Sequence, residues 1–253
     1  MKRKPLLSAV LITRNGARML EACLRSVRFA DETVVLDAGS TDATVAIAQR
    51  MGAHVFLDRR PPGGFGPARN LAMTKARGSW ILFIDSDETA TPGLRREILR
   101  TIRARDSADA YEIPRRNFYF GRWVRRGGRY PDRQRRLLRR GKARYRGEIH
   151  EHLDVHGRLG RLSQPLDHHP YPDLDEYLRK LGFYAAEQAR LLRARGVRPG
   201  LLTAARYRVL KPLSRFTRRY FLKLGFLDGV PGFFACLHDA LTYIFTYTYL
   251  RAG

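Results

Sequence analysis

The sequence is poor in cysteine and in acidic residues for its length. Its 253 residues include two cysteines, Cys23 and Cys236, which lie far apart in the chain. This is not the pattern of a disulfide framework, and it fits a reducing compartment. There are 24 acidic residues against 48 lysines and arginines, so the formal net charge is +24. A chain with this charge favours a polyanionic partner such as nucleic acid, an anionic membrane surface or a phosphorylated substrate.

Long hydrophobic runs are also missing. No uninterrupted apolar run reaches the roughly 18 residues expected of a membrane-spanning helix. The first residues, M-K-R-K-P-L-L-S-A-V-L-I-T-R-N, resemble a signal peptide, but the apolar part is short and ends at Arg14 and Asn15. No small-residue cleavage site follows. We therefore interpret residues 6–13 as a buried first strand and predict that the protein is not exported.

Short apolar segments alternate with helix-like segments over the first hundred residues. In residues 17–27, for example, the apolar residues recur at helical spacing. We expect strands at 6–13, 32–37, 53–57 and 79–84, helices at 17–27, 43–51 and 68–76, and a Gly/Pro loop at 61–67. Strands separated by helices favour an α/β fold, with a mainly parallel sheet flanked by helices.

Polar residues stand just past three of these strands, at Asn15, Asp37 and Asp85. Ligands bind at the carboxyl ends of the strands in such sheets. A single acid after a strand is commonly structural. Several polar groups that converge on one edge favour a binding site, and we predict one here.

The stretch W-I-L-F-I-D-S-D-E at 80–88 places two carboxylates close together in a very basic chain. Asp85 and Asp87 would repel each other, and a divalent cation would remove that conflict. Mg²⁺ and Mn²⁺ bind through one or two carboxylates plus substrate phosphates, which points to a diphosphate-bearing substrate. The alternative is a cap, in which Asp87 or Thr89 satisfies backbone N–H groups of a following helix. For Glu88 we expect only that it favours the start of that helix.

Four motifs in this half of the chain carry a family resemblance. They are T-R-N at 13–15, L-D-A-G-S-T-D-A-T at 36–44, G-P-A-R-N at 66–70 and F-I-D-S-D-E at 83–88. Together they resemble the family-2 glycosyltransferases, inverting enzymes with the GT-A fold, which is the Rossmann-like fold of nucleotide-diphospho-sugar transferases. The resemblance implies a UDP-sugar donor. Asp37 would contact its uracil or ribose with Thr13 and Asn15 nearby, and Arg69 would help to hold the nucleotide.

The same resemblance implies a metal site. Asp85 would lie near the ribose and the metal, and Asp87 would ligate Mg²⁺ or Mn²⁺. His168 and His169, in the motif H-H-P-Y at 168–171, are candidates for a further metal ligand or a diphosphate contact. For any one histidine, a hydrogen-bonded position in a loop is the commoner outcome.

The middle and the tail are similar to one branch of that family, the lipopolysaccharide inner-core heptose β-1,4-glucosyltransferases. The matching pieces are Y-P-D-R-Q-R-R-L-L-R-R at 130–140, G-E-I-H-E-H-L at 147–153, H-H-P-Y at 168–171 and G-F-L-D-G-V-P-G-F at 225–233. The Q-x-x-R-W motif of processive synthases is missing, because Gln134 is followed by R-R-L-L. This favours transfer of one sugar per encounter.

A sugar acceptor requires a general base for its hydroxyl group. Glu148 and Glu151 are the candidates by position, and the resemblance implies Glu151 because it follows the Ile-His pair. The alternative is that these acids neutralise neighbouring arginines. His150 and Arg136 are candidates for contacts with the acceptor or its phosphates. A polyprenyl phosphate acceptor is already anionic and hardly needs a base, so Glu151 favours a sugar.

The positive charge concentrates in the middle of the chain, where residues 115–146 contain fourteen arginines and lysines against one acid. Basic residues interleaved with aromatic ones can bind nucleic acid. They can also bind a phosphorylated glycolipid in an anionic membrane. The tail, 206–250, mixes cations with Tyr, Phe and Leu and favours the membrane, although a helical subdomain packed on the catalytic domain is the alternative for 174–195. No recognisable nucleic-acid-binding motif occurs.

We therefore predict a metal-dependent inverting glycosyltransferase with two parts. Residues 1–165 form the catalytic domain, with 6–100 binding the nucleotide-sugar and 101–165 the acceptor, and 166–253 form a helical, membrane-associating extension. The predicted reaction moves a hexose, glucose from UDP-glucose, onto a heptose of the lipopolysaccharide inner core. The alternatives are a polyprenyl phosphate or other glycan acceptor and, outside enzymes, a nucleic-acid-binding protein. We expect a cytoplasmic location, on the cytoplasmic face of the inner membrane.

Overall fold

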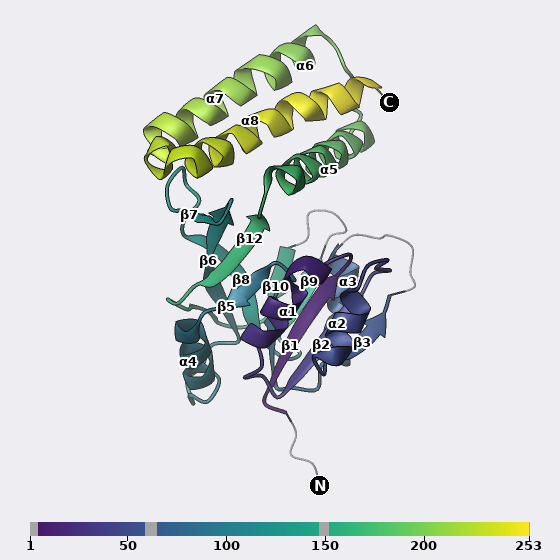
Figure 1. Ribbon diagram of the computed structural model, residues 1–253, viewed down its shortest axis with the longest axis vertical. Helices are drawn as coiled ribbons and strands as arrows, with labels where there is room; N and C mark the ends of the chain where they lie inside the picture. The colour runs from purple at the N-terminus through teal and green to yellow at the C-terminus, as the bar shows by residue number, and fades with distance from the viewer. Residues whose placement is uncertain (1–4, 59–64, 147–151, 253) are drawn as a thin grey trace. The chain divides into compact units, whose positions relative to one another are not determined.

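A computed structural model describes residues 5–58, 65–146 and 152–252 (Figure 1). The chain divides into two compact units. The first unit comprises residues up to 115 together with 133–168, and the second comprises 116–132 and 169–253. The predicted boundary at 165/166 therefore lies close to one crossing point between the units. The assignment of 116–132 to the C-terminal part was not predicted.

The first unit is built around a mixed sheet with helices on both faces. Its helices are α1 (Ala17–Ser26), α2 (Thr44–Arg50), α3 (Phe65–Lys75) and α4 (Pro92–Thr101). Its strands are β1 (Leu7–Thr13), β2 (Glu32–Asp37), β3 (His54–Leu57), β4 (Trp80–Phe83), β5 (Glu88–Ala90), β8 (Asp132–Arg139), β9 (Ala143–Arg146), β10 (His152–Val155) and β11 (Leu159–Arg161). Two further strands, β6 (Ala110–Tyr119) and β12 (Leu166–Tyr171), begin in this unit and end in the second.

The strands β3, β2, β1 and β4 are parallel neighbours in that order. The full order is β3-β2-β1-β4-β8-β6-β12-β5, and β9 and β10 form a separate two-stranded sheet. β8 pairs with β4 in the antiparallel direction. The predicted mainly parallel sheet with flanking helices is confirmed for the first hundred residues, and the later strands make the sheet mixed.

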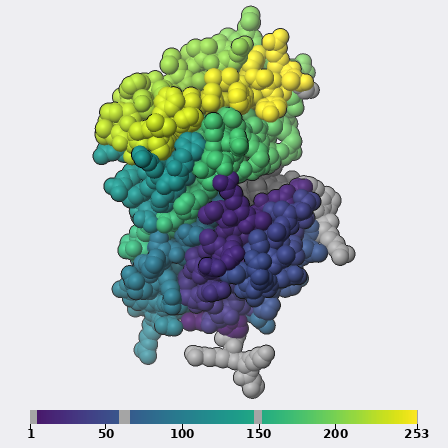
Figure 2. Space-filling view, viewed as in Figure 1, coloured from purple at the N-terminus to yellow at the C-terminus, as the bar shows by residue number. Residues whose placement is uncertain are grey.

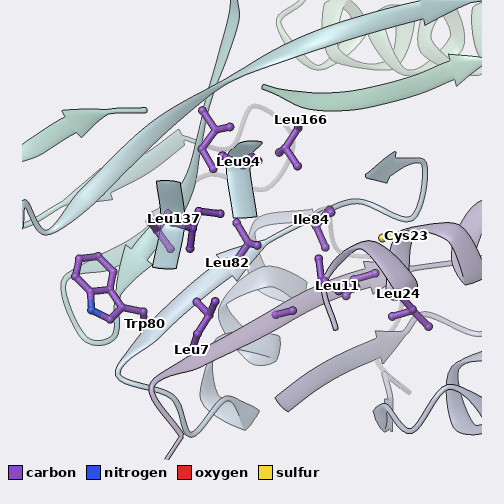
Figure 3. Packing of buried hydrophobic residues seen from close by; sticks show 14 of the residues in the cluster. Leu7, Leu11, Cys23, Leu24, Trp80, Leu82, Ile84, Leu94, Leu137 and Leu166 are labelled. Carbon is purple, nitrogen blue, oxygen red and sulfur yellow. The ribbon is translucent and has the colours of Figure 1, made fainter. Parts of the chain in front are cut away.

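Alternation along β1 explains how both faces of the sheet are covered. Successive side chains of a strand point to opposite faces. Leu7 and Leu11 accordingly lie in the core cluster that includes the buried face of α1, whereas Val10 lies in the cluster that includes α3. Figure 3 shows the first cluster, in which Cys23 of α1 and Ile84 after β4 approach Leu11. All four residues of β4 are buried, so Asp85 and Asp87 follow directly on a segment of the hydrophobic core.

Three predicted boundaries moved by a few residues. α3 begins at Phe65, within the stretch predicted as a loop, and α1 ends at Ser26. The second helix begins at Thr44, whose backbone N–H donates to the Asp42 side chain at 3.0 Å. This contact satisfies a backbone N–H at the start of α2 that has no partner within the helix.

The second unit is mainly helical. It contains β7 (Arg122–Val124), α5 (Leu174–Ala194), α6 (Leu201–Ala205), η1 (Arg206–Leu210), α7 (Lys211–Thr217), η2 (Arg218–Leu222), η3 (Gly225–Asp228) and α8 (Gly229–Ala252). α8 packs against α5 on one side and α7 on the other (Figure 1). The expected helical extension from residue 166 begins as a strand, β12, and becomes helical only at Leu174.

In the part of the chain that the structure describes, no single helix has the length and apolar character to cross a membrane. By length and composition alone, one bent pair passes the same test, Leu201–Leu222 with Gly225–Ala252, at an angle of 71°.

Candidate functional site

The polar residues predicted to converge do lie at one edge of the parallel strands. β1 pairs with β2 so that Thr13 is opposite Asp37, and Val10 of β1 is opposite Phe83 of β4. Asp85 is the second residue after the end of β4 and therefore belongs to the same carboxyl edge. The chain leaves β1 for β2 on one side and returns to β4 on the other. This makes the edge between β1 and β4 a topological switch point, where ligands bind in such sheets.

The loop after β2 is held to the end of β1 by polar contacts. The Asp37 side chain is buried, and its Oδ2 accepts hydrogen bonds from the backbone N–H of Gly39 (3.1 Å) and Ser40 (2.9 Å). Asn15, with φ of 53°, accepts from the N–H of Thr41 at 2.8 Å and donates its own N–H to Ser40. Asp37 and Asn15 thus shape the rim of the edge in this structure.

The hydroxyl of Thr13 lies beside this rim. Its Oγ1 is buried and has no hydrogen-bond partner within the described ranges. A Cβ added at Gly16 would come 2.5 Å from this oxygen and 2.9 Å from the hydroxyl of Ser86, so glycine is needed for this close approach. A buried hydroxyl without a partner costs free energy, and a ligand at the edge could supply the missing hydrogen bond.

Asp85 is held by two arginines. Arg136 donates hydrogen bonds to both carboxylate oxygens, and Arg69 lies 3.4 Å from Oδ1. Burial favours the neutral form of this carboxyl group, but the guanidinium groups of Arg136 and Arg69 outweigh it and lower the pKa of Asp85 to about 2. The charge conflict between Asp85 and Asp87 is therefore relieved in part by the guanidinium groups of Arg136 and Arg69.

The expectation for Glu88 is wrong. Glu88 does not begin a helix but starts the short strand β5, and it is fully buried. One oxygen pairs with Arg136 at 2.9 Å and with Arg115 at 3.1 Å, and the other accepts the backbone N–H of Asp85 at 3.0 Å. Glu88 therefore anchors both the backbone of Asp85 and the arginine that binds its side chain.

Arg136 reaches this place through strand pairing that the sequence does not reveal. β8 runs antiparallel to β4 with Leu137 opposite Leu82, which brings Arg136 to the end of β4. Its side chain is almost fully buried between Asp85 and Glu88. The contact with the acceptor or its phosphates that we expected for Arg136 stays a prediction. The dense arginines of 115–146 signalled a role for charge, but not which arginine turns inward.

Arg69 and Asn70, in the motif G-P-A-R-N, connect α3 to β9. The side chain of Asn70 exchanges two hydrogen bonds with the backbone of Tyr145, at 2.8 and 2.9 Å. The guanidinium carbon of Arg69 lies 5.2 Å from the ring centroid of the same tyrosine. Because Arg69 also contacts Asp85, helix α3, strand β9 and the end of β4 form one connected polar cluster.

The carboxylate of Asp87 and the imidazole of His168 lie close together next to this cluster. Nε2 of His168 lies 3.6 Å from Oδ1 of Asp87, because β12 pairs with β5 and His168 is opposite Glu88. His169 belongs to the second unit and stacks on Phe118 with ring centroids 4.7 Å apart. Of the two candidate histidines, His168 is the one beside Asp87.

The donor set at Asp87 fits a divalent cation only with help from a substrate. In the described part of the chain, no three His, Cys, Asp or Glu side chains gather as a metal cluster. Asp87 and His168 would supply two ligands to such a cation, and Asp85 lies nearby but is paired with arginine. Two protein ligands completed by phosphate oxygens and water are the usual arrangement for Mg²⁺ or Mn²⁺ in nucleotide sites.

The predicted base, Glu151, lies outside the described residues, as do His150 and Glu148. Their roles stay predictions from the sequence.

Comparison with known proteins finds glycosyltransferases among the relatives of this chain. The chain is 28% identical over 254 residues to LpsC, a lipopolysaccharide core biosynthesis glycosyltransferase of Rhizobium meliloti, and the match covers 98% of this chain and 90% of LpsC. An uncharacterized glycosyltransferase of Rickettsia bellii is 28% identical over 240 residues, which cover 90% of this chain and 80% of the relative.

Solved structures show the same fold. The structure of residues 1–349 of TarS from S. aureus, in complex with UDP-GlcNAc, has a TM-score of 0.53 and 17% identity, and it matches over 97% of this chain and 90% of that chain. The model of glycosyl transferase family 2 matches residues 8–163, which include the whole parallel half of the sheet and the cluster around Asp85. The chain therefore belongs to glycosyl transferase family 2.

Proposed function

We propose that this protein transfers glucose from UDP-glucose, with inversion, to a heptose hydroxyl of the lipopolysaccharide inner core. The observation that carries the donor half is the polar edge at β1, β2 and β4, where Thr13, Asp37 and Asp85 come together. The similarity to LpsC over nearly the whole chain supports the acceptor half, because that relative acts in lipopolysaccharide core biosynthesis. Family membership also favours an enzyme over a nucleic-acid-binding protein.

The residues of the edge divide the work of donor binding. Thr13 offers a buried hydroxyl, and Asp37 and Asn15 hold the rim against which a nucleoside would lie. The guanidinium group of Arg69 would place positive charge near the nucleotide and help to hold it. Asp87 and His168 would hold Mg²⁺ or Mn²⁺, which supplies positive charge to the diphosphate leaving group. Arg136 binds the side chain of Asp85 and Glu88 binds its backbone N–H, so the Asp85 carboxylate is held in one position.

In this mechanism the acceptor hydroxyl attacks the anomeric carbon as the bond to UDP breaks. The hydroxyl oxygen forms the new glycosidic bond, its proton passes to the Glu151 carboxylate, and the electron pair of the broken bond leaves with UDP. Single displacement inverts the configuration at the anomeric carbon. Transfer to a polyprenyl phosphate is the second candidate, which the need for a base at Glu151 disfavours.

The location follows from the acceptor. A phosphorylated glycolipid under assembly lies in the cytoplasmic leaflet of the inner membrane, so the proposal places the protein there as a peripheral, cytoplasmic protein. The arginines of 115–146 that lack acidic neighbours in the sequence would attract its phosphates.

The donor and acceptor are tested with purified protein, Mn²⁺ and radiolabelled UDP-glucose. We expect label to enter inner-core lipopolysaccharide that ends in heptose, and none to enter undecaprenyl phosphate. UDP-GlcNAc and UDP-galactose serve as donor controls. Label in the polyprenyl phosphate would replace the proposed acceptor by the second candidate. UDP release from another sugar nucleotide alone would overturn the donor assignment.

Glu151→Gln is expected to lower kcat by about 10²- to 10⁴-fold while leaving UDP affinity unchanged, because the amide can no longer accept the proton. Steady-state kinetics and isothermal titration with UDP measure the two effects. Glu148→Gln is the matched control, since it changes the same residue type three positions away. An unchanged kcat for Glu151→Gln, or an equal loss for Glu148→Gln, would exclude Glu151 as the base.

A further inference from the structure

The helix that begins at Leu201 changes its geometry along its length. α6, η1, α7 and η2 follow one another without a break from Leu201 to Leu222, and η1 and η2 are π-helical. An α-helix repeats every 3.6 residues, whereas a π turn is wider. The two π segments therefore keep residues spaced four apart on one face, which a uniform α-helix of this length would not do.

The inward face of this helix is occupied by contacts within the second unit. Nζ of Lys211 lies 4.0 Å from the ring centroid of Tyr207. Arg215 and Arg219 both pair with Asp239 of α8, at 3.3 and 2.7 Å. These residues follow one another at intervals of four and fix the helix against α8.

The opposite face, which we call the outward face, is exposed and carries mostly apolar residues together with two arginines. It consists of two rows at the same spacing: Ala205, Val209, Leu213, Thr217 and Phe221 in one, and Arg206, Leu210, Ser214, Arg218 and Leu222 in the other. All ten are exposed, and the side chains of Leu213 and Leu222 reach 63% and 77% exposure. Within the described ranges, the guanidinium groups of Arg206 and Arg218 form no ion pair or hydrogen bond. Residues 201–222 contain no Asp or Glu.

The exposed apolar surface continues past the end of the helix into a tip formed by Leu224, Phe226, Leu227 and Val230, which are 41–65% exposed. α8 differs from this surface. Its apolar residues Ala235, Cys236 and Ala240 are buried, because α8 lies between α5 and α7. In Figures 1 and 2 the light green helix of 201–222 accordingly forms the border of the second unit on the side of α8 away from α5.

We propose that the outward face and the tip lie on an anionic bilayer, with the leucine, valine and phenylalanine side chains in the interfacial region and Arg206 and Arg218 at the lipid headgroups. The outward face combines apolar residues with cations and contains no acid, which matches anionic lipid in both respects. The one acid of the tip segment, Asp228, accepts a hydrogen bond from the backbone N–H of Arg126. A second copy of this chain is a poor occupant, because its like-charged face would bring arginines against arginines. The inference assigns membrane contact to the outward face and the tip, which includes α8 only at its start, Val230, in contrast to the whole of 206–250 expected from the sequence.

The test is cosedimentation of the full chain with vesicles of phosphatidylcholine, with and without phosphatidylglycerol. We expect binding to the anionic vesicles only, weakened by added KCl. Leu213→Gln combined with Leu222→Gln should weaken binding by roughly tenfold or more, since burial of one leucine is worth about a factor of ten in an equilibrium constant. Arg206→Gln combined with Arg218→Gln, which removes no apolar contact, should weaken binding by roughly tenfold as well.

Leu178→Gln on α5 is the matched control, because Leu178 is 50% exposed but lies off the outward face. We expect it to bind vesicles as the wild type does. The assignment is overturned by equal loss in Leu178→Gln, by equal binding to neutral vesicles, or by no vesicle binding. It is also overturned by a lipid-free dimer that dissociates in the double leucine variant. Vesicle binding is measured without donor or acceptor, so it stands or falls independently of the proposed reaction.

Discussion

Asp87→Ala is expected to reduce glycosyl transfer by about 10²- to 10³-fold at saturating Mn²⁺. Asp87 is the carboxylate of the D-S-D motif that lies beside His168, whereas Asp85 is bound by Arg136 and Arg69. Loss of charge stabilisation at a diphosphate leaving group is worth several kcal/mol, and about 1.4 kcal/mol corresponds to tenfold in rate. Initial rates with UDP-glucose as a function of Mn²⁺ concentration measure the effect.

A second readout separates metal binding from a general loss of structure. Titration calorimetry should show that Mn²⁺ raises the affinity of the wild type for UDP and no longer does so in Asp87→Ala. Asp106→Ala removes an exposed acid of the same unit and should behave as the wild type. If UDP binding by Asp87→Ala remained dependent on Mn²⁺, Asp87 would not be a metal ligand.

Glu88→Ala is expected to lower the free energy of unfolding by about 3–5 kcal/mol. Removing one member of a buried ion network leaves its partners desolvated and without compensating charge. Here the partners are Arg115 and Arg136, and the backbone N–H of Asp85 also loses its acceptor. Urea unfolding followed by circular dichroism measures the change, and Glu88→Gln, which keeps the shape and one acceptor oxygen, should lose less.

Glu21→Ala is the matched control for this substitution. Glu21 of α1 pairs with Arg25 of the same helix and with Arg50 of α2, and both arginines are more than half exposed. Exposed ion pairs contribute about 0–1 kcal/mol, so this variant should unfold close to the wild type. A loss in Glu88→Ala no larger than that in Glu21→Ala would contradict an anchoring role for Glu88.

The parts of the site that the sequence predicted depend on local pattern. Apolar segments of strand length followed by Asn15, Asp37 and Asp85 gave both the strands and their polar ends, because parallel strands put their carboxyl ends on one edge whatever follows in the chain. The motif around Arg69 likewise predicted a place near this edge, and the structure brings Arg69 to Asp85.

Glu88 and Arg136 show where local pattern fails. The local sequence around Glu88 has D-S-D before the acid side chain and Thr91 and Pro92 after it. This pattern is compatible with the start of a helix and with the start of a strand. β12 provides the pairing that makes 88–90 a strand, and β8 carries Arg136 to the end of β4. Both strands lie more than 40 residues away in the sequence, so no window around Glu88 contains the information.

The sequence by itself determined the α/β class, the approximate positions of the first four strands along the chain and the family, because hydrophobic periodicity and closely spaced motifs are local properties. Tertiary structure decided which charges turn inward, since burial of Glu88 and Arg136 depends on distant strands that exclude water around them. It also decided which part of the basic, aromatic tail is exposed. α8 is the more apolar helix, yet its buried position between α5 and α7 leaves the outward face of 205–222 to meet the solvent or a membrane.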